Sequence, residues 1–405
     1  MELADNRYGF LHGLRILDLA DEKASFCTKI LADMGARVIK VEKPGGDTSR
    51  NIGPFFKDIS RTKNSIPFFY NNTNKLGITL DLQHNEGQSI FSKLVPNTDV
   101  VVETFAPGDL KRMGLNFKVL NALNPQLILA SVTGFGQNGP RRNFKTSDMV
   151  ASAYGGQMYV CGSPSAPPLK SCGDQSYYAA SLFAATAILL AVRNRAKTGT
   201  GEHLDISLQA SVTATLEHVM VRYFTEGIIY QRQESLHWNE GFVILPCKDG
   251  LIHVTLFQKW ETLIEWLASE GMADDLVDEK WLDEDYRRDH LQHVIAVLEK
   301  WTTAHSVDEI FELAQLMRFP WAPVRSPNEA CNSPQLKARK FFIEREYAGS
   351  GKTVNTPGSP YKTSRNIDAR INSAPIPGEH NEMIYRQELG LSAKNLKRLY
   401  DNNVI

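Results

Sequence analysis

The feature that most constrains the fold is an alternation, over the first two hundred residues, of short β-branched runs with amphipathic stretches. This alternation is typical of βαβ units, in which a parallel sheet has helices on both faces. Between the first two runs, apolar residues recur at helical spacing and Gly35 follows as a helix C-terminal signal; these residues are Phe26, Ile30, Leu31 and Met34. The pattern therefore predicts an α/β fold with strands at 14–19, 37–42, 77–82, 100–104, 127–133 and 204–208.

The pattern changes after about residue 225. Two adjacent apolar runs, joined by Lys248-Asp249-Gly250, predict a β-hairpin with an Asp-Gly turn. A capping box at Ser306–Glu309 marks the start of a helix. From about residue 331 the chain is rich in Pro, Ser and Asn, and it closes with a short helical segment. We therefore expect a large domain from 1–225 and 331–405, the latter a return linker and tail, and a smaller α+β domain from 226–330.

The composition excludes several classes of protein. A hydrophobic content of 42%, a charged content of 22% and a net charge of -1 describe a globular chain and argue against a nucleic-acid partner. Five scattered cysteines without a C-x-x-C pair, and ten histidines without an H-x-x-x-H pair, indicate neither disulfides nor a metal site. The apolar run at 177–192 is short for a bilayer, and the amino-terminus has no export signal. We expect a cytoplasmic protein without a membrane span.

Two features near strand ends bear on ligands. The loop after the first strand has no glycine, which argues against a G-x-G-x-x-G dinucleotide site. Ligands of open α/β sheets bind beside the carboxyl ends of strands, so cations there could converge on phosphates, although each alone could equally be a solvated charge. These cations are Lys40, Lys43, Arg50, Lys75, Lys111, Arg112, Arg141, Arg142 and Lys145.

A single carboxylate, Asp174, lies just ahead of the Ala-rich run. Its position suits a helix N-cap that accepts backbone N–H groups. It also suits a reactive group at the mouth of a helix, and the residue pattern leaves both interpretations open.

Several blocks resemble, in family order and over nearly the whole chain, the class III CoA-transferases, which include formyl-CoA and carnitine CoA-transferases; they include "ILADMGARVIKVEKPGGDTSR", "VVVETFAPGDLKRMGLNF", "LNPQLILASVTGFGQNGP" and "RAKTGTGEHLDISLQAS". The resemblance implies an acyl-CoA thioester as substrate, and neither a metal nor a permanently bound cofactor. It also implies a Rossmann-like large domain and two interlocked subunits, as a homodimer or as a heterodimer with a homologous chain.

The same resemblance implies which side chains contact CoA. They are Lys43, Lys75, Thr104, Phe105, Arg112, Met113 and Lys145. Thr104 stands where the family commonly has Asn, which weakens one expected hydrogen bond.

In the family a catalytic Asp attacks the donor thioester and forms anhydride and aspartyl-CoA thioester intermediates, which split one transfer into easier steps. The ungapped register places Tyr177 at that position, and Asp174 lies three residues earlier. A phenol cannot form the anhydride. Either a shift of one helical turn brings Asp174 into place, or this chain lacks the nucleophile.

Four functions remain open on the sequence. The first is a CoA-transferase subunit that moves CoA from an acyl-CoA to a carboxylic acid. The second is a catalytically silent CoA-binding subunit of a hetero-oligomer, of which benzylsuccinate CoA-transferase is one example. The third is a 2-methylacyl-CoA racemase type, disfavoured because Ser147 stands in the place of a basic His. The last is a non-enzymatic CoA-binding protein.

Overall fold

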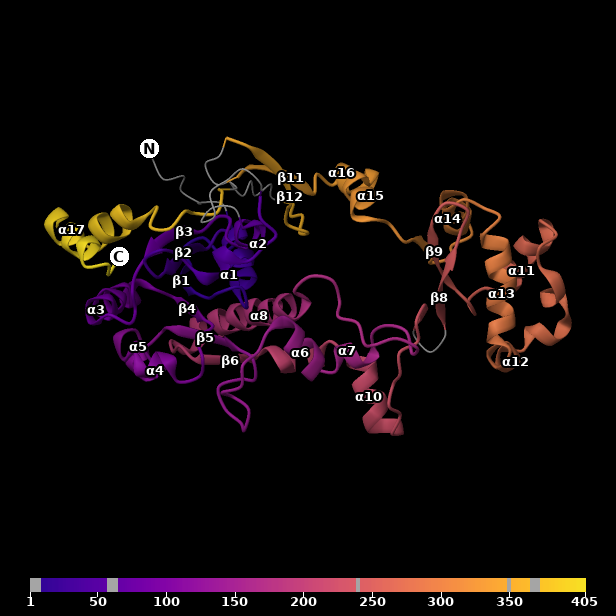
Figure 1. The fold of residues 1–405 in the computed structure, drawn as a ribbon, viewed down its shortest axis with the longest axis horizontal. Coiled ribbons are helices and arrows are strands. Elements are labelled where there is room, and N and C mark those ends of the chain that lie inside the picture. Colours follow the sequence, from indigo (N-terminus) through magenta and orange to yellow (C-terminus); the bar gives the residue numbers. More distant parts are fainter. Residues whose placement is uncertain (1–8, 57–64, 238–240, 348–350, 365–371) are drawn as a thin grey trace. The chain divides into compact units, whose positions relative to one another are not determined.

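The computed structural model of the chain describes residues 9–56, 65–237, 241–347, 351–364 and 372–405, which Figure 1 shows as a coloured ribbon. Most of the amino-terminal segment considered above lies outside these residues. The chain forms two compact units, the larger one from Met1–Met158, Lys170–Ile229 and Phe341–Ile405. The smaller unit comprises Tyr159–Leu169 and Tyr230–Lys340. The expected division ended the small domain at 330, whereas the structure continues that unit to Lys340 and adds the 159–169 segment.

The larger unit is built on a six-stranded parallel sheet in the order β3-β2-β1-β4-β5-β6. All six strands occur where the sequence predicted them, so the α/β fold is confirmed. Their bounds are β1 Arg15–Leu19, β2 Arg37–Glu42, β3 Leu76–Thr79, β4 Val100–Glu103, β5 Ile128–Thr133 and β6 His203–Ser207. The strand order reverses between β1 and β4, and such a reversal is where open α/β sheets bind ligands.

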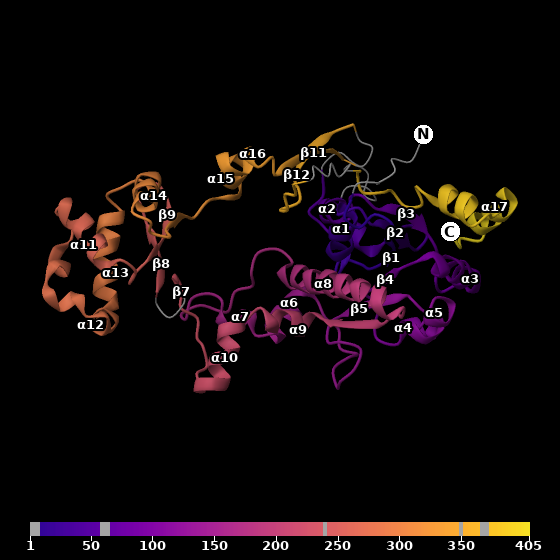
Figure 2. The ribbon, with the colours of Figure 1, turned by 180° about the vertical axis from the view of Figure 1, so that it is seen from behind.

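Helices cover both faces of this sheet, and Figures 1 and 2 show them from opposite sides. One face packs against α1 (Ser25–Asp33), α6 (Asp148–Tyr154), α8 (Gln175–Thr198) and α9 (Leu208–Ala214). The other packs against α3 (Asn85–Leu94), α4 (Asp109–Arg112), α5 (Phe117–Leu123), the π-helix Glu382–Glu388 and α17 (Ala393–Asp401). Alternate residues of each strand therefore enter opposite cores, as expected for a parallel sheet buried on both sides.

The buried face of α1 differs from the predicted one. Leu31 is fully buried, but Cys27 and Ala32 share that face, while Phe26, Ile30 and Met34 stay partly exposed. Gly35 ends the helix as predicted, with φ of 99°.

The carboxyl-terminal tail returns to the large unit and covers the edge strand β3. The backbone N–H of His380 donates to the carbonyl of Gly77 at 2.8 Å, and the Tyr385 hydroxyl donates to the carbonyl of Thr79 at 2.6 Å. These bonds occupy an otherwise free sheet edge, which would invite pairing with another chain.

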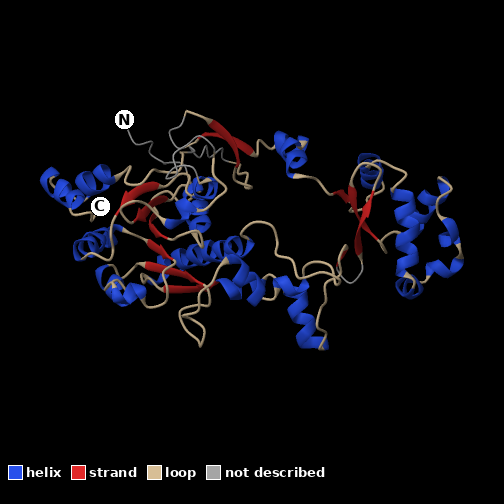
Figure 3. Cartoon of the chain, viewed as in Figure 1, coloured by secondary structure: helices blue, strands red, loops and turns tan. Residues whose placement is uncertain are grey.

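The smaller unit contains an antiparallel sheet and a helical layer, which Figure 3 separates by colour. Its sheet order is β10-β9-β8-β7, and the predicted hairpin with the Asp-Gly turn is confirmed as β8 (Phe242–Pro246) and β9 (Leu251–Thr255). The capping box at Ser306 and Glu309 is confirmed as well. The remaining elements of this unit are β7 Leu236–His237, β10 Ala322–Pro323, α11 Trp260–Ser269, α12 Glu284–Asp289, α13 Leu291–Thr302, α14 Val307–Leu316, α15 Pro327–Asn332 and α16 Pro334–Ala338.

The Ala-rich run forms α8, which spans 24 residues and is longer than the apolar run alone suggested. The helix α8 is long and apolar enough to cross a membrane. These two properties are weak evidence for a membrane span, because the core helices of soluble proteins share them. Ala180, Ala184 and Ile188 are fully buried against the sheet. This packing fits the predicted buried helix. The other helices and strands of the larger unit are α2 Ile66–Asn71, α10 Glu217–Glu226, β11 Phe342–Glu346 and β12 Thr353–Pro357; α7, Gln157–Val160, spans the boundary between the units.

Candidate functional site

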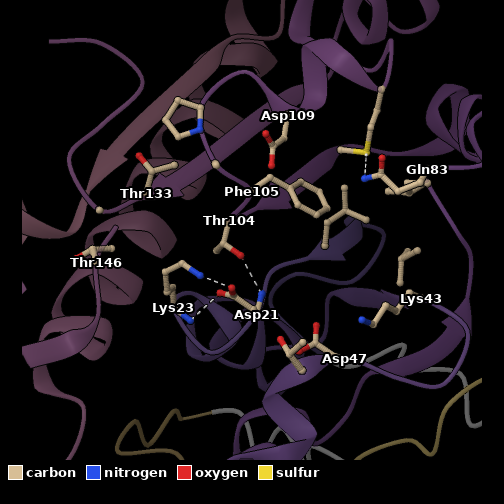
Figure 4. A pocket seen from close by; sticks show the side chains of 18 of the residues that line it. Asp21, Lys23, Lys43, Asp47, Gln83, Thr104, Phe105, Asp109, Thr133 and Thr146 are labelled. Carbon is tan, nitrogen blue, oxygen red and sulfur yellow. Dashed lines mark hydrogen bonds and ion pairs between the residues drawn. The ribbon is translucent and has the colours of Figure 1, made fainter. Parts of the chain in front are cut away.

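A cavity of about 530 Å³ lies where the carboxyl ends of β1 to β5 meet, at the reversal of strand order. We call it the strand-end cavity, and Figure 4 shows it from close by. It is lined by Leu19, Asp21, Lys23, Val41, Glu42, Lys43, Asp47, Thr48, Leu80, Asp81, Leu82, Gln83, Thr104, Phe105, Ala106, Pro107, Asp109, Met113, Thr133, Gly134, Arg142, Asn143, Phe144, Lys145 and Thr146. Its position follows from topology, since parallel strands end at one edge of the sheet.

Five of the seven side chains predicted to contact CoA line this cavity. They are Lys43, Thr104, Phe105, Met113 and Lys145. Lys43, Arg142 and Lys145 are exposed cations that form no ion pair among the described residues. Unpaired cations beside apolar groups such as Phe105 and Met113 suit a ligand that carries both phosphates and a long neutral arm.

Lys75 does not line the cavity, and its contact with CoA stays a prediction. Its ammonium is fully buried, pairs with Asp18 at 2.9 Å and donates to Thr28 at 2.7 Å and Asn72 at 2.8 Å. Burial lowers the pKa of Lys75 to about 8, although the Asp18 carboxylate acts in the opposite direction. Lys75 lies outside the cavity because it precedes β3, whereas Gln83, which does line the cavity, follows it.

Arg112 does not line the cavity either. It lies in α4 with a largely exposed side chain and pairs with Asp109, which does line the cavity. The structure therefore places Arg112 beside the site and engages its guanidinium with a neighbouring carboxylate.

A glycine-containing loop after β2 forms one wall of the cavity. Asp47 caps the turn 48–51 by accepting the Ser49 backbone N–H at 2.8 Å, and its other oxygen lies 3.2 Å from the Lys40 ammonium. Burial raises the pKa of Asp47, but the charge of Lys40 and the Ser49 hydrogen bonds outweigh it and hold this pKa at about 2. The Arg50 guanidinium donates two hydrogen bonds of 2.6 Å each to the Glu42 carboxylate. These buried pairs hold the loop that presents Lys43.

The loop after β1 carries charged side chains whose place in the site the residue pattern did not single out. Asp21 and Lys23 line the cavity and pair with each other, as Figure 4 shows. The Thr104 hydroxyl accepts the backbone N–H of Asp21 at 3.0 Å, so the residue that replaces the family Asn supports this loop. The signal that could have identified them is position, since Asp21 directly follows a predicted strand.

Glu103 is bonded to the backbone of Phe105, which lines the cavity. Its carboxylate accepts the Phe105 backbone N–H at 2.7 Å. Burial raises the pKa of Glu103 to about 7, despite a hydrogen bond from Ser131 that lowers it.

The start of α8 places Asp174 at the helix mouth but without the hydrogen bond that the N-cap interpretation expected. Asp174 occupies the N-cap position, but its side chain makes no cap hydrogen bond, and it is exposed and outside the strand-end cavity. Asp148 performs the capping role instead: it accepts the Ser176 backbone N–H at 2.8 Å and pairs with Lys170 at 2.7 Å. Loss of hydration at the helix start raises the pKa of Asp174, and the nearby Asp148 charge raises it further. The predicted N-cap bond is therefore wrong.

Tyr177 is buried, with only 9% of its surface exposed, and belongs to the core between α8 and the sheet. Burial raises the pKa of its phenol, and the charges of Glu22 and Asp21 add to that shift. Tyr177 is not among the residues that line the strand-end cavity.

Ser147 acts as a structural residue. Its hydroxyl caps α6 by accepting the Val150 backbone N–H at 3.3 Å. It offers no base for proton abstraction from a branched acyl-CoA. No group of three or more metal-ligating side chains occurs among the residues that the structure describes.

Comparison with known proteins bears out the resemblance. The sequence model of CoA-transferase family III matches residues 11–381. The chain is 29% identical over 379 residues to succinyl-CoA:(R)-benzylsuccinate CoA-transferase subunit BbsE of Thauera aromatica, covering 91% of this chain and 92% of that protein. It is also 29% identical to the succinyl-CoA–L-malate CoA-transferase beta subunit of Chloroflexus aurantiacus, covering 98% of each.

Among solved structures, a CAIB/BAIF family protein from Brucella suis matches with a TM-score of 0.81 and 29% sequence identity, covering 94% of this chain and 99% of that one. The family match, the relatives and the fold agree over nearly the entire chain. The protein therefore belongs to CoA-transferase family III.

Proposed function

We propose that this chain is the CoA-binding, catalytically silent subunit of a hetero-oligomeric CoA-transferase, whose homologous partner subunit supplies the nucleophilic Asp. The complex moves CoA from an acyl-CoA donor to a carboxylic acid. The observation that carries the proposal is the burial of Tyr177, the residue that the ungapped register places at the family's nucleophile position; Asp174 lies one helical turn earlier and is exposed.

Two further observations support it. The strand-end cavity keeps three unpaired cations, which a CoA phosphate binder needs and a vestigial site would not. The relatives in Thauera and Chloroflexus are both named as subunits of CoA-transferases. We therefore infer CoA thioesters as ligands, an interlocked heterodimer as the working assembly, and the reducing cytoplasm as its compartment.

Hydroxylamine separates the proposal from a self-sufficient transferase, because it traps an aspartyl thioester irreversibly. The purified chain is incubated with succinyl-CoA and hydroxylamine, and CoA binding is then measured by calorimetry. We expect CoA to bind and no hydroxamate to form on the chain alone. A hydroxamate on Asp174 would contradict the proposal and assign the nucleophile to this chain.

The matched variant is Tyr177→Asp, which places a carboxylate in the family register. We expect this variant to gain the hydroxylamine-sensitive adduct, whereas Asp174→Asn leaves CoA binding unchanged. Loss of CoA binding in Asp174→Asn would contradict the placement of Asp174 outside the cavity.

A further inference from the structure

The chain between β5 and α6 forms one wall of the strand-end cavity. Its residues 138–145 are all exposed to solvent. We call them the cationic strap, because they carry three cations and no carboxylate. In Figure 4, Thr146, which directly follows the strap, lies across the cavity from Lys43. Four residues of the strap also line the cavity: Arg142, Asn143, Phe144 and Lys145.

Both ends of the cationic strap are fixed to the larger unit. Before it, the backbone N–H of Gln137 donates to both carboxylate oxygens of Asp205, at 3.0 and 2.9 Å. After it, Thr146 packs so closely on Gly134 that a Cβ added to this glycine would lie 2.4 Å from the Thr146 methyl group. The two ends therefore anchor the strap to the end of β5 and to β6.

Between these anchors the cationic strap makes few bonds. Its backbone hydrogen bonds to described residues are those from the Phe144 N–H to the Arg141 carbonyl at 2.9 Å and from the Arg142 N–H to the Gly139 carbonyl at 3.5 Å. Both lie within the strap, so its movement breaks no backbone hydrogen bond to the rest of the larger unit. Segments with so few bonds move at a low cost in free energy.

The charge of the cationic strap points to an anionic ligand. Arg141, Arg142 and Lys145 are close in sequence, and none of them forms an ion pair in the part of the chain that the structure describes. Like charges this close repel one another, and an anion in the cavity relieves the repulsion. Arg141 lies over the rings of Phe144 and Tyr154, at 5.4 and 5.2 Å from their centres. Arg142 and Lys145 line the cavity instead and are therefore available to phosphates.

The Phe144 ring adds an apolar surface beside these cations. It lines the cavity and is nevertheless 55% exposed. Phe135 meets it only edge to face, with ring centres 6.2 Å apart. Contact with a ligand removes part of the exposed ring from water, which is favourable. A bound ligand therefore favours a position of the strap closer to the cavity.

We propose that the cationic strap closes on bound CoA, with Arg142 and Lys145 pairing with its phosphates and Phe144 covering the ligand. The proposal rests on the proposed function for the identity of the ligand. It adds a conformational step, in which the strap turns about its two anchors after CoA enters the cavity.

Trypsin tests the closure directly, because it cuts after Arg141, Arg142 and Lys145. The full chain is digested briefly with and without CoA, and the fragments are identified by mass spectrometry. At a CoA concentration of about ten times the Kd, we expect cleavage within the strap to slow by about 10-fold. Cleavage after Lys340, an exposed residue of the smaller unit, should keep its rate.

The outcomes separate the strap from the proposed function. Unchanged cleavage of the strap, in a sample whose calorimetry shows bound CoA, would overturn the closure and leave the proposed function standing. A free chain that is cut after Lys340 and not within the strap would also overturn it. If calorimetry showed no CoA binding, the proposed function would fail and the closure with it.

Two neighbouring substitutions test the pairing with phosphates. Arg142→Gln removes a cation that lines the cavity, and the matched control Arg141→Gln removes one that does not. We expect the Kd for CoA to rise about 10- to 100-fold in Arg142→Gln alone, the range for one charge-assisted hydrogen bond. Equal Kd values for the two variants would show that Arg142 pairs with no phosphate.

Phe144→Trp tests the covering of the ligand. Its tryptophan emission, taken as the difference from the wild-type chain, should shift to shorter wavelength when CoA binds, because the ring leaves water. Phe10 is 58% exposed and outside the cavity, so Phe10→Trp should show no shift. Bound CoA without a shift in Phe144→Trp would overturn the role of this ring.

Discussion

The strand-end cavity and the start of α8 differ in the side chains that they present. The cavity presents unpaired cations, supported by buried ion pairs and by the Thr104 and Glu103 hydrogen bonds. The start of α8 presents a buried Tyr177 and an exposed Asp174 that makes no cap bond. This difference between a cavity suited to CoA and a helix start without a carboxylate in the ungapped register is the basis of the proposal that this chain is a ligand-holding subunit.

The largest expected effect is on stability and concerns the buried ion pair between Lys75 and Asp18. Lys75→Met leaves Asp18 buried without its counter-charge, which should lower the free energy of unfolding by about 3–5 kcal/mol. Urea denaturation measures this, and Lys43→Met, at an exposed unpaired position, serves as the control. If Lys75→Met instead left stability unchanged and abolished CoA binding, Lys75 would be a ligand contact and not a structural residue.

A smaller effect concerns the unpaired cations. Lys43→Ala and Lys145→Ala each remove one charge-assisted bond to a phosphate, worth about 1.5–3 kcal/mol, so the Kd for CoA should rise about 10- to 100-fold. Calorimetry measures the Kd, and Lys111→Ala, an exposed lysine outside the cavity, should leave it unchanged. If Lys111→Ala weakened CoA as much as Lys43→Ala, the phosphates would lie elsewhere.

The effect that is smallest per pH unit is the pH dependence expected from Glu103, whose carboxylate accepts the Phe105 backbone N–H. Because burial raises the pKa of Glu103 from 4.5 to about 7, the folded state binds more protons than the unfolded state between these values. The free energy of unfolding should therefore fall as pH rises through this window, by at most about 1.4 kcal/mol per pH unit from this group. Denaturation at several pH values should show a shallower slope in Glu103→Gln, and an identical slope would contradict the assignment.

Much of the fold could be predicted because strand patterns are local. The β-branched runs identified β1 to β6, and the Asp-Gly turn identified the β8–β9 hairpin, since each depends on neighbouring residues only. The split between the units was placed less well, because no local signal shows that 159–169 joins the smaller unit.

The site could be predicted only in part, because side-chain partners are set by tertiary packing. Lys43 and Lys145 matched the cavity, whereas Lys75 is held in the core by an Asp18 carboxylate 57 residues away. Asp174 looked like a helix cap, but Asp148, a residue distant in sequence, satisfies that helix end.

The most direct test of the central claim is intact-mass and peptide-mapping spectrometry of the isolated chain after incubation with succinyl-CoA. We expect an unmodified mass for the wild-type chain, although it binds CoA, and a CoA adduct on the peptide that carries Tyr177→Asp in the variant. A CoA thioester on Asp174 of the wild-type chain would contradict it.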